Sequence, residues 1–172
     1  MASVLVVHHS RTGTCRTLAR SLAEARHWLA GEVTYLEARE AYWPCARDAL
    51  LRRAPRIRYT GPDPAVVDVV VLVSPIWCWR LSPPMRSFVR SMRGKLTKVA
   101  VLSCMGGSGA ANAVAEVERL IRRPVVATLA LRQADVAASR HAAALQDFAD
   151  VVAACTADSA RHDPGEALRH AA

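Results

Sequence analysis

The sequence lacks a hydrophobic run long enough to cross a membrane. Its apolar stretches fall well short of the roughly 18 residues that span a bilayer. The apolar run Val4–Val7 near the N-terminus also lacks the preceding basic residues of a secretory signal peptide. We therefore predict a cytoplasmic protein with no membrane partner.

The cysteines are spaced in a way that disfavours two further classes of protein. They are an odd set of five, and no two of them have the C-x-x-C spacing of zinc or redox motifs. A disulfide framework and a structural zinc site are therefore disfavoured. Neither a Ser/His/Asp arrangement nor the spacing of metal ligands is evident, so the sequence assigns no catalytic residue, no metal and no hydrolytic activity. The cysteines are Cys15, Cys45, Cys78, Cys104 and Cys155.

Lysine is scarce although the chain is strongly basic. The formal net charge is +8, yet Lys95 and Lys98 are the only lysines, and the arginines are scattered along the chain. The sequence has no basic tract with interleaved aromatic residues, which proteins that bind single-stranded nucleic acid use. We therefore disfavour a nucleic-acid partner and attribute the charge to compositional bias. For the same reason we expect Arg80 and Arg86 to be solvated rather than to bind a nicotinamide phosphate.

The sequence does contain a regular alternation of buried strands and amphipathic helices. Its 172 residues, 52% hydrophobic and 22% charged, are typical of one globular domain. We predict a domain over residues 1–156 and a polar tail over residues 157–172. This alternation indicates an α/β fold, a doubly wound sheet of five parallel strands with helices on both faces. The predicted strands are 4–7, 32–36, 66–73, 98–103 and 125–131, and the main helices are 14–25, 82–92, 110–122 and 136–155.

A hydroxyl-rich turn over residues 10–15 joins the first strand to the first helix. The first N–H groups of a helix have no partner within the helix, and the helix dipole favours an anion there. Ser10, Thr12 and Thr14 add hydroxyl donors, and Gly13 lets the backbone approach a bound group closely. The lysine of a GxxxxGK[ST] triphosphate loop is absent. The turn therefore suits a single phosphate group.

Two further loops are expected at the same edge of the sheet, because the carboxyl ends of parallel strands lie together. One loop, over residues 74–84, carries two tryptophans close to prolines. The other, over residues 103–109, is rich in glycine and offers backbone N–H groups. A phosphate turn, an aromatic surface and a donor-rich loop at one edge suit a flat, phosphorylated heteroaromatic ligand.

The three loops resemble those of the flavodoxin-like FMN-binding family, and the likeness covers about residues 1–155. Residues 10–15 resemble its S/T-x-T-G-N-T phosphate loop. Residues 74–79 resemble its G-S-P-I-W-W-G loop beside the flavin, and residues 103–109 its loop after the fourth strand. The resemblance implies a three-layer α/β/α fold with FMN as the cofactor, similar to the short-chain members of the family.

The resemblance also implies which residues would contact FMN. The first loop would bind the phosphate, the second would line the isoalloxazine ring, and backbone groups of the third would meet its pyrimidine edge. The implied cofactor-binding residues are Ser10, Thr12, Gly13, Thr14 and Cys15, then Pro75, Ile76, Trp77, Cys78 and Trp79, and then Cys104, Met105, Gly106 and Gly107.

The chain departs from the family pattern at several points. Cys15 stands where the family has a hydroxyl, and two hypotheses remain for it: an inert packed thiol, which we favour, or a thiol whose pKa the helix N-terminus lowers. The third loop lacks the tyrosine that stacks on the flavin in many electron carriers, so Met105 covers that face or the face is open. His8 and His9 follow the first strand, and we expect them to make local hydrogen bonds rather than to touch the phosphate.

The resemblance implies redox transfer through bound FMN. A reductase that passes electrons from NAD(P)H to a quinone-like or protein acceptor competes with a one-electron carrier. From a different class comes a domain of this fold that binds a partner and catalyses nothing.

Overall fold

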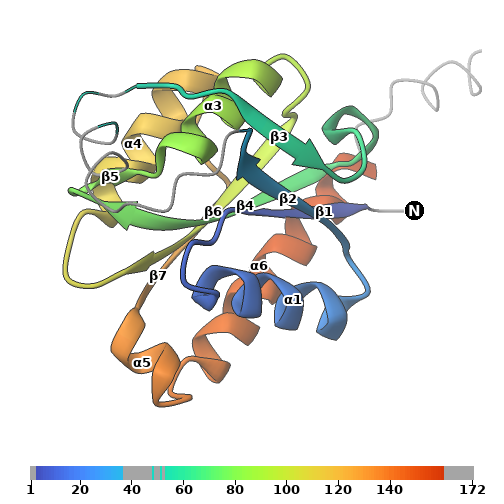
Figure 1. Ribbon diagram of the computed structural model, residues 1–172. Helices are drawn as coiled ribbons and strands as arrows, with labels where there is room; N and C mark the ends of the chain where they lie inside the picture. The colour runs from blue at the N-terminus through green and yellow to red at the C-terminus, as the bar shows by residue number, and fades with distance from the viewer. Residues whose placement is uncertain (1–2, 37–47, 49–50, 52, 161–172) are drawn as a thin grey trace, which may run out of the picture.

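The computed structural model describes residues 3–36, 48, 51 and 53–160. They form a sheet between two layers of helices (Figure 1). The strands are β1 Val4–His8, β2 Leu29–Tyr35, β3 Ile57–Thr60, β4 Val69–Trp77, β5 Arg80–Leu81, β6 Lys98–Met105 and β7 Ala127–Arg132. The helices are α1 Thr14–Arg26, the 3-10 turn η1 Pro64–Val66, α3 Pro83–Met92, α4 Ala110–Ile121, α5 Gln133–Ala137 and α6 Ala142–Ala160.

The sheet is mostly parallel, and its strand order is β3-β2-β1-β4-β6-β7. The five predicted strands correspond to β2, β1, β4, β6 and β7, which pair in parallel. This confirms the doubly wound α/β fold, but in the described part of the chain the sheet has seven strands rather than five. The sequence analysis missed β3, an antiparallel edge strand, and β5, a two-residue partner of β4. Both are short, so neither produces a long apolar run.

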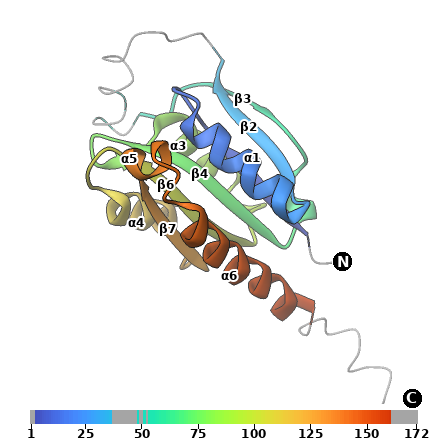
Figure 2. The ribbon, with the colours of Figure 1, turned by 90° about the horizontal axis from the view of Figure 1, so that it is seen from below.

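The helices cover the two faces of the sheet and enclose two hydrophobic cores. Helices α1 and α6 lie side by side on one face (Figure 2), where Leu18 and Phe148 pack against β4 and β6. Helices α3 and α4 lie on the other face, where Phe88 and Val117 pack against the same two strands. Because both faces of the central strands are covered, all five residues of β1 are buried. Among the described helices, none is both long enough and apolar enough to span a bilayer.

Two predicted boundaries were wrong. The helix predicted over residues 136–155 is two helices, α5 and α6, separated where Ser139 adopts a left-handed conformation with φ of 54°. The strand predicted over residues 32–36 begins earlier, at Leu29, so Gly31 lies inside β2. The ring of Tyr59 on β3 approaches it so closely that a Cβ atom there would lie 2.7 Å from the Tyr59 oxygen. Gly31 is therefore needed for strand packing.

The C-terminal part of the chain is described only in part. Helix α6 continues to Ala160, past the end of the predicted domain at residue 156. Residues 161–172 lie outside the described residues, so the tail remains a prediction. Cys45 and most of the segment 37–52 also lie outside them.

Candidate functional site

Three loops meet around a cavity of about 290 Å³ at the carboxyl edge of the sheet, which we call the carboxyl-edge cavity. The loops follow β1, β4 and β6, the three central strands. The strand order reverses between β1 and β4, since β2 lies beyond β1 and β6 lies beyond β4, and ligands of doubly wound folds bind at such a point. The lining residues are Ser10, Arg11, Thr12, Thr14, Cys15, Pro75, Ile76, Trp77, Cys104, Gly106 and Gln133.

The first loop presents the open N-terminus of α1 to this cavity. Gly13 caps the helix with φ of 94°, a conformation that favours glycine, and its N–H donates to the Ser10 Oγ at 3.1 Å. No side chain caps the helix, so the N–H groups of residues 14–16 have no partner within it. Among the described residues, the hydroxyls of Thr12 and Thr14 have no hydrogen-bond partner. The loop therefore offers several unused donors to an anion.

Cys15 is a buried thiol. Its side chain is 2% exposed and lies beside the thiol of Cys104, which also lines the cavity. A hydrogen bond with Cys104, and then burial, raise the pKa of Cys15 far above its ordinary value, whereas the same hydrogen bond lowers the pKa of Cys104. The hypothesis that the helix N-terminus lowers the pKa of Cys15 is therefore wrong, because desolvation and the neighbouring sulfur outweigh the helix dipole.

Among the described residues, Trp77 is the aromatic residue that lines the cavity, and the ring of His9 packs against it. The two rings are edge to face, with their centroids 5.7 Å apart, and Tyr35 packs on His9 in the same way. The Nδ1 of His9 lies 2.8 Å from the Val33 carbonyl oxygen, which places a proton on Nδ1 of the neutral ring. Burial lowers the pKa of His9. His9 therefore makes a hydrogen bond as predicted, but its acceptor lies on the neighbouring strand β2, 24 residues along the chain, rather than locally.

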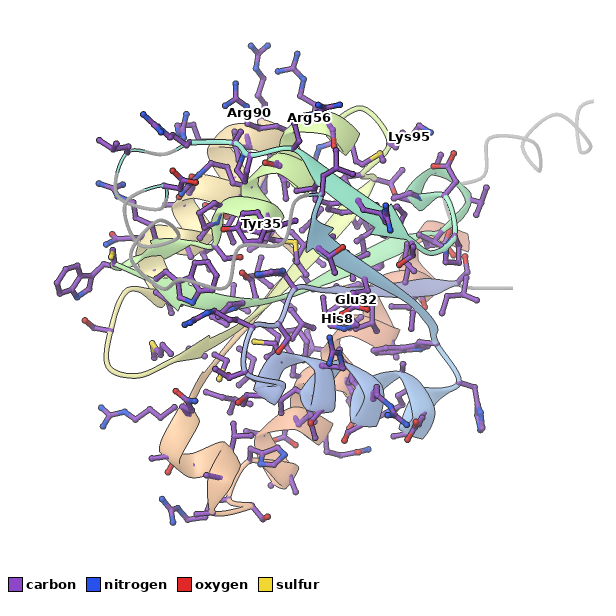
Figure 3. The ribbon with its side chains drawn as sticks, in the orientation of Figure 1. His8, Glu32, Tyr35, Arg56, Arg90 and Lys95 are labelled. Carbon is purple, nitrogen blue, oxygen red and sulfur yellow. The ribbon has the colours of Figure 1, made fainter. Side chains whose placement is uncertain are left out.

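His8, the last residue of β1, lies beside Glu32 of β2. Its Nε2 lies 3.6 Å from an oxygen of Glu32, which also accepts a hydrogen bond from Arg16 (Figure 3). Burial lowers the pKa of His8, and the Arg16 hydrogen bond lowers that of Glu32. His8 does not line the cavity.

Cys78 and Trp79 form the turn between β4 and β5 and do not line the cavity. Both have left-handed φ angles, 48° and 59°, which a two-residue hairpin of this kind requires and which asparagine and glycine usually supply. Trp79 is 62% exposed, and its indole N–H donates to the Ser108 Oγ at 3.0 Å. Gly109 lies against this turn, since a Cβ atom there would be 2.6 Å from the Trp79 Cα. The second and third loops are thus packed together.

The third loop contributes only part of what we predicted, and a fourth segment contributes Gln133. Cys104 and Gly106 line the cavity, whereas Met105 and Gly107 do not. Gln133 directly follows β7 and begins α5. Gln133 was not predicted as a site residue, because the last helix was predicted to begin only at residue 136. Its position just after the predicted strand 125–131 is the signal that could have identified it.

Arg86, predicted to be solvated, is 2% exposed. Its guanidinium pairs with the buried carboxylate of Glu116, 30 residues along the chain. A residue so distant in sequence gives no local pattern, and the prediction was therefore wrong.

Known structures share this architecture although their sequences are distant. No protein-family model and no curated protein matches the sequence. A flavoprotein from Lactobacillus acidophilus NCFM, solved in complex with FMN, is 17% identical, with a TM-score of 0.68 over 81% of this chain and 98% of that one. A Bacteroides eggerthii protein described as a flavoprotein is 20% identical, with a TM-score of 0.70 over 89% of this chain and 99% of its own.

An archaeal flavodoxin shows the same similarity at lower identity. It is 14% identical, with a TM-score of 0.53 over 91% of this chain and 97% of that one. Together with the β2-β1-β4-β6-β7 order, these similarities define the fold as flavodoxin-like.

Proposed function

We propose that the carboxyl-edge cavity binds FMN. The observation that carries this proposal is the convergence of an uncapped helix N-terminus, an indole and a glycine-rich loop on one cavity at the reversal of the strand order. A helix N-terminus with free hydroxyls suits a phosphate monoester, and an indole suits a flat ring. The FMN complex of the Lactobacillus flavoprotein, which has the same fold, supports the choice of ligand.

Different lining residues would contact different parts of the cofactor. The N–H groups at the start of α1, with Thr12 and Thr14, would hold the phosphate, while the Ser10 hydroxyl keeps the turn closed. Trp77, with His9 behind it, would lie along the isoalloxazine ring. Backbone groups at Cys104 and Gly106 would meet the pyrimidine edge. Pro75 and Ile76 complete the wall, and Gly13 sets the turn.

We further propose that the protein transfers electrons, with FMN supplying the redox chemistry when bound. The third loop places no aromatic ring on the cavity, and Cβ atoms at Gly106 and Gly107 would meet nothing within 4 Å. This open surface favours a reductase that accepts small substrates at the ring, with NAD(P)H as donor and a quinone-like or protein acceptor, over a one-electron carrier.

A titration with FMN tests the proposal. We expect saturable quenching of flavin fluorescence, and we expect Thr12→Ala to weaken binding by about 1–3 kcal/mol, because a hydrogen bond to a charged phosphate is lost. The matched control is Thr17→Ala, which removes an exposed threonine within α1, five residues further along the chain, and should leave affinity unchanged. Equal losses in the two variants would remove Thr12 from the phosphate site.

The electron donor is tested separately by adding NADH or NADPH to the FMN-loaded protein without oxygen. Bleaching of the flavin absorbance at a rate above that of free FMN supports a reductase. If the protein does not bind FMN at all, the fold serves the non-catalytic, partner-binding alternative instead.

A further inference from the structure

A second concave region lies between α3 and α4, which we call the α3–α4 cleft. It encloses about 580 Å³ and shares no lining residue with the carboxyl-edge cavity. Both helices begin at the carboxyl edge, but the cleft is lined by their later residues, from Arg86 and Glu116 onward. The lining residues are Arg86, Arg90, Arg93, Glu116, Arg119, Leu120 and Arg122.

A buried ion pair forms the floor of the cleft. The guanidinium of Arg86 on α3 pairs with the carboxylate of Glu116 on α4, through its Nε and, at 3.2 Å, through its Nη2. Its Nη1 also donates to the Arg53 carbonyl oxygen and its Nη2 to the Leu81 carbonyl oxygen, each at 3.0 Å. The floor is therefore a neutral pair in which each guanidinium nitrogen donates a hydrogen bond, and it sets the spacing of α3 and α4.

The rim of the cleft consists of Arg90, Arg93, Arg119 and Arg122. It carries four positive charges that the described part of the chain leaves unpaired. Elsewhere, Arg16, Arg20, Arg26 and Arg140 each pair with a carboxylate. The rim arginines are exposed and make no ion pair with any described residue. The C-terminal dipoles of α3 and α4 offset only about half a charge each. The rim therefore has a surplus of positive charge around one concavity.

From this geometry we propose that the α3–α4 cleft binds a small organic anion that carries two or more phosphate groups. Arginine's planar fork matches phosphate oxygens in pairs, and the cleft volume is that of a small-molecule site. Among the residues that the structure describes, the lining contains no aromatic side chain on which a nucleobase could stack, and Leu120 is its only apolar residue. The ligand is therefore recognised through its charge. The rim arginines are Arg90, Arg93, Arg119 and Arg122.

Figure 3 shows how the rim is presented. Arg90 projects from α3 away from the sheet, toward solvent. On the facing helix, Arg119 lies in the last turn of α4, three residues beyond Glu116. Residues from both helices can thus contact one ligand while the ion pair below them stays intact.

Calorimetric titration of the full chain with sodium tripolyphosphate tests the proposal. At physiological ionic strength we expect one molecule bound per chain. The double variant Arg90→Gln/Arg119→Gln should bind about 30-fold more weakly, because charged hydrogen bonds from both helices are lost. The matched control Arg20→Gln/Arg140→Gln removes the same charge from exposed positions outside the cleft and should stay within about twofold of the parent.

Four results would overturn the proposal. The first is no binding of tripolyphosphate, and the second is an equal loss in the two double variants, which would leave only the general charge of the chain. The third is a single-stranded DNA or polyglutamate that binds at least tenfold more tightly than tripolyphosphate through the same arginines, which would make the cleft a macromolecular surface. Binding that persists in the presence of saturating FMN separates this site from the carboxyl-edge cavity, and displacement by FMN would also overturn it.

Discussion

The carboxyl-edge cavity and the α3–α4 cleft are two concave regions of one small domain that are built in opposite ways. The cavity uses backbone N–H groups, hydroxyls and one indole, and most of these come from loops of consecutive residues. The cleft uses guanidinium groups from two helices, held apart by a buried ion pair. A loop-built site leaves a readable motif in the sequence, whereas a helix-face site leaves only scattered arginines.

The difference has an energetic side. Open donors at a helix end are solvated by water when no ligand is present, so the cavity costs the fold little. The floor of the cleft, by contrast, places two charges out of water, which is tolerable only while each satisfies the other. We therefore expect the two regions to respond differently to mutation.

The largest expected effect comes from breaking the floor of the cleft. Glu116→Ala leaves the Arg86 guanidinium buried without its carboxylate and should lower the free energy of unfolding by about 3–5 kcal/mol. Urea unfolding measures this loss. Glu24→Ala, which breaks an exposed pair with Arg20, should cost less than about 1 kcal/mol. The double variant Arg86→Met/Glu116→Leu should recover most of the stability, and a cost below about 1 kcal/mol for Glu116→Ala would contradict the account.

Substitution of two glycines of the third loop, Gly109 and Gly106, should affect the stability of the fold to different extents. Gly109→Ala places a Cβ atom 2.6 Å from the Trp79 Cα at φ of 112° and should destabilise the fold by about 1–3 kcal/mol. At Gly106 a Cβ atom meets nothing within 4 Å, so Gly106→Ala should leave the unfolding free energy unchanged. Thermal unfolding of both variants is the measurement. Equal stability of the two variants would mean that the hairpin turn and the third loop are not held together as described.

The two tryptophans of the second loop should differ in their effect on FMN binding. Trp77→Ala removes the ring that lines the cavity and should weaken FMN binding by about 1–2 kcal/mol, the scale of stacking on an aromatic ring. Trp79→Ala removes an exposed ring tied to Ser108 and should change affinity by less than about 0.5 kcal/mol. Fluorescence titration with FMN measures the affinity of both variants. A larger loss for Trp79→Ala than for Trp77→Ala would mean that Trp79, and not Trp77, lies against the flavin.

The last expected effect is a pH dependence from His9, the histidine that packs against Trp77. Burial lowers the pKa of His9 below its ordinary value of 6.5, so the unfolded chain binds more protons than the folded one in mild acid. Stability from this residue is complete above pH 6.5 and declines as the pH falls, by at most about 1.4 kcal/mol for each pH unit.

A variant at the same position isolates this contribution. His9→Asn keeps a donor toward the Val33 carbonyl oxygen but does not titrate, so its unfolding free energy should fall less steeply between pH 7 and pH 5. Chemical denaturation at several pH values measures the two slopes. Parallel slopes for the parent and the variant would show that His9 does not contribute to the pH dependence.

Local sequence patterns predicted the central fold well because each central strand is a nearly continuous apolar run. Such runs place β1, β4 and β6 in the middle of a covered sheet without knowledge of their partners. The edge strand β3 alternates half-buried and exposed residues over four positions, and β5 has two residues, so neither stands out. The break at Ser139 was also invisible, because serine is compatible with helix and with turn.

The candidate site was predictable to the extent that it lies in contiguous loops. Residues 10–15, 74–79 and 103–109 reach the same edge because parallel strands end there. Which side chains face the cavity depends on backbone angles that the sequence does not reveal. Trp77 and Trp79 are near neighbours, yet the left-handed turn between β4 and β5 sends only Trp77 toward the cavity. Gln133 joined the site through the position of α5.

By itself, the sequence determined the alternation of strands and helices, the uncapped glycine turn before α1, and the edge at which the loops meet. These follow from local apolar patterns and from the geometry of parallel strands. Only the tertiary structure decided that the Cys15 thiol lies beside the Cys104 thiol, that Arg86 is buried against Glu116, and that five arginines line one cleft. Each of these depends on residues far apart in the chain, and charge, pKa and solvation are set by what lies near in space.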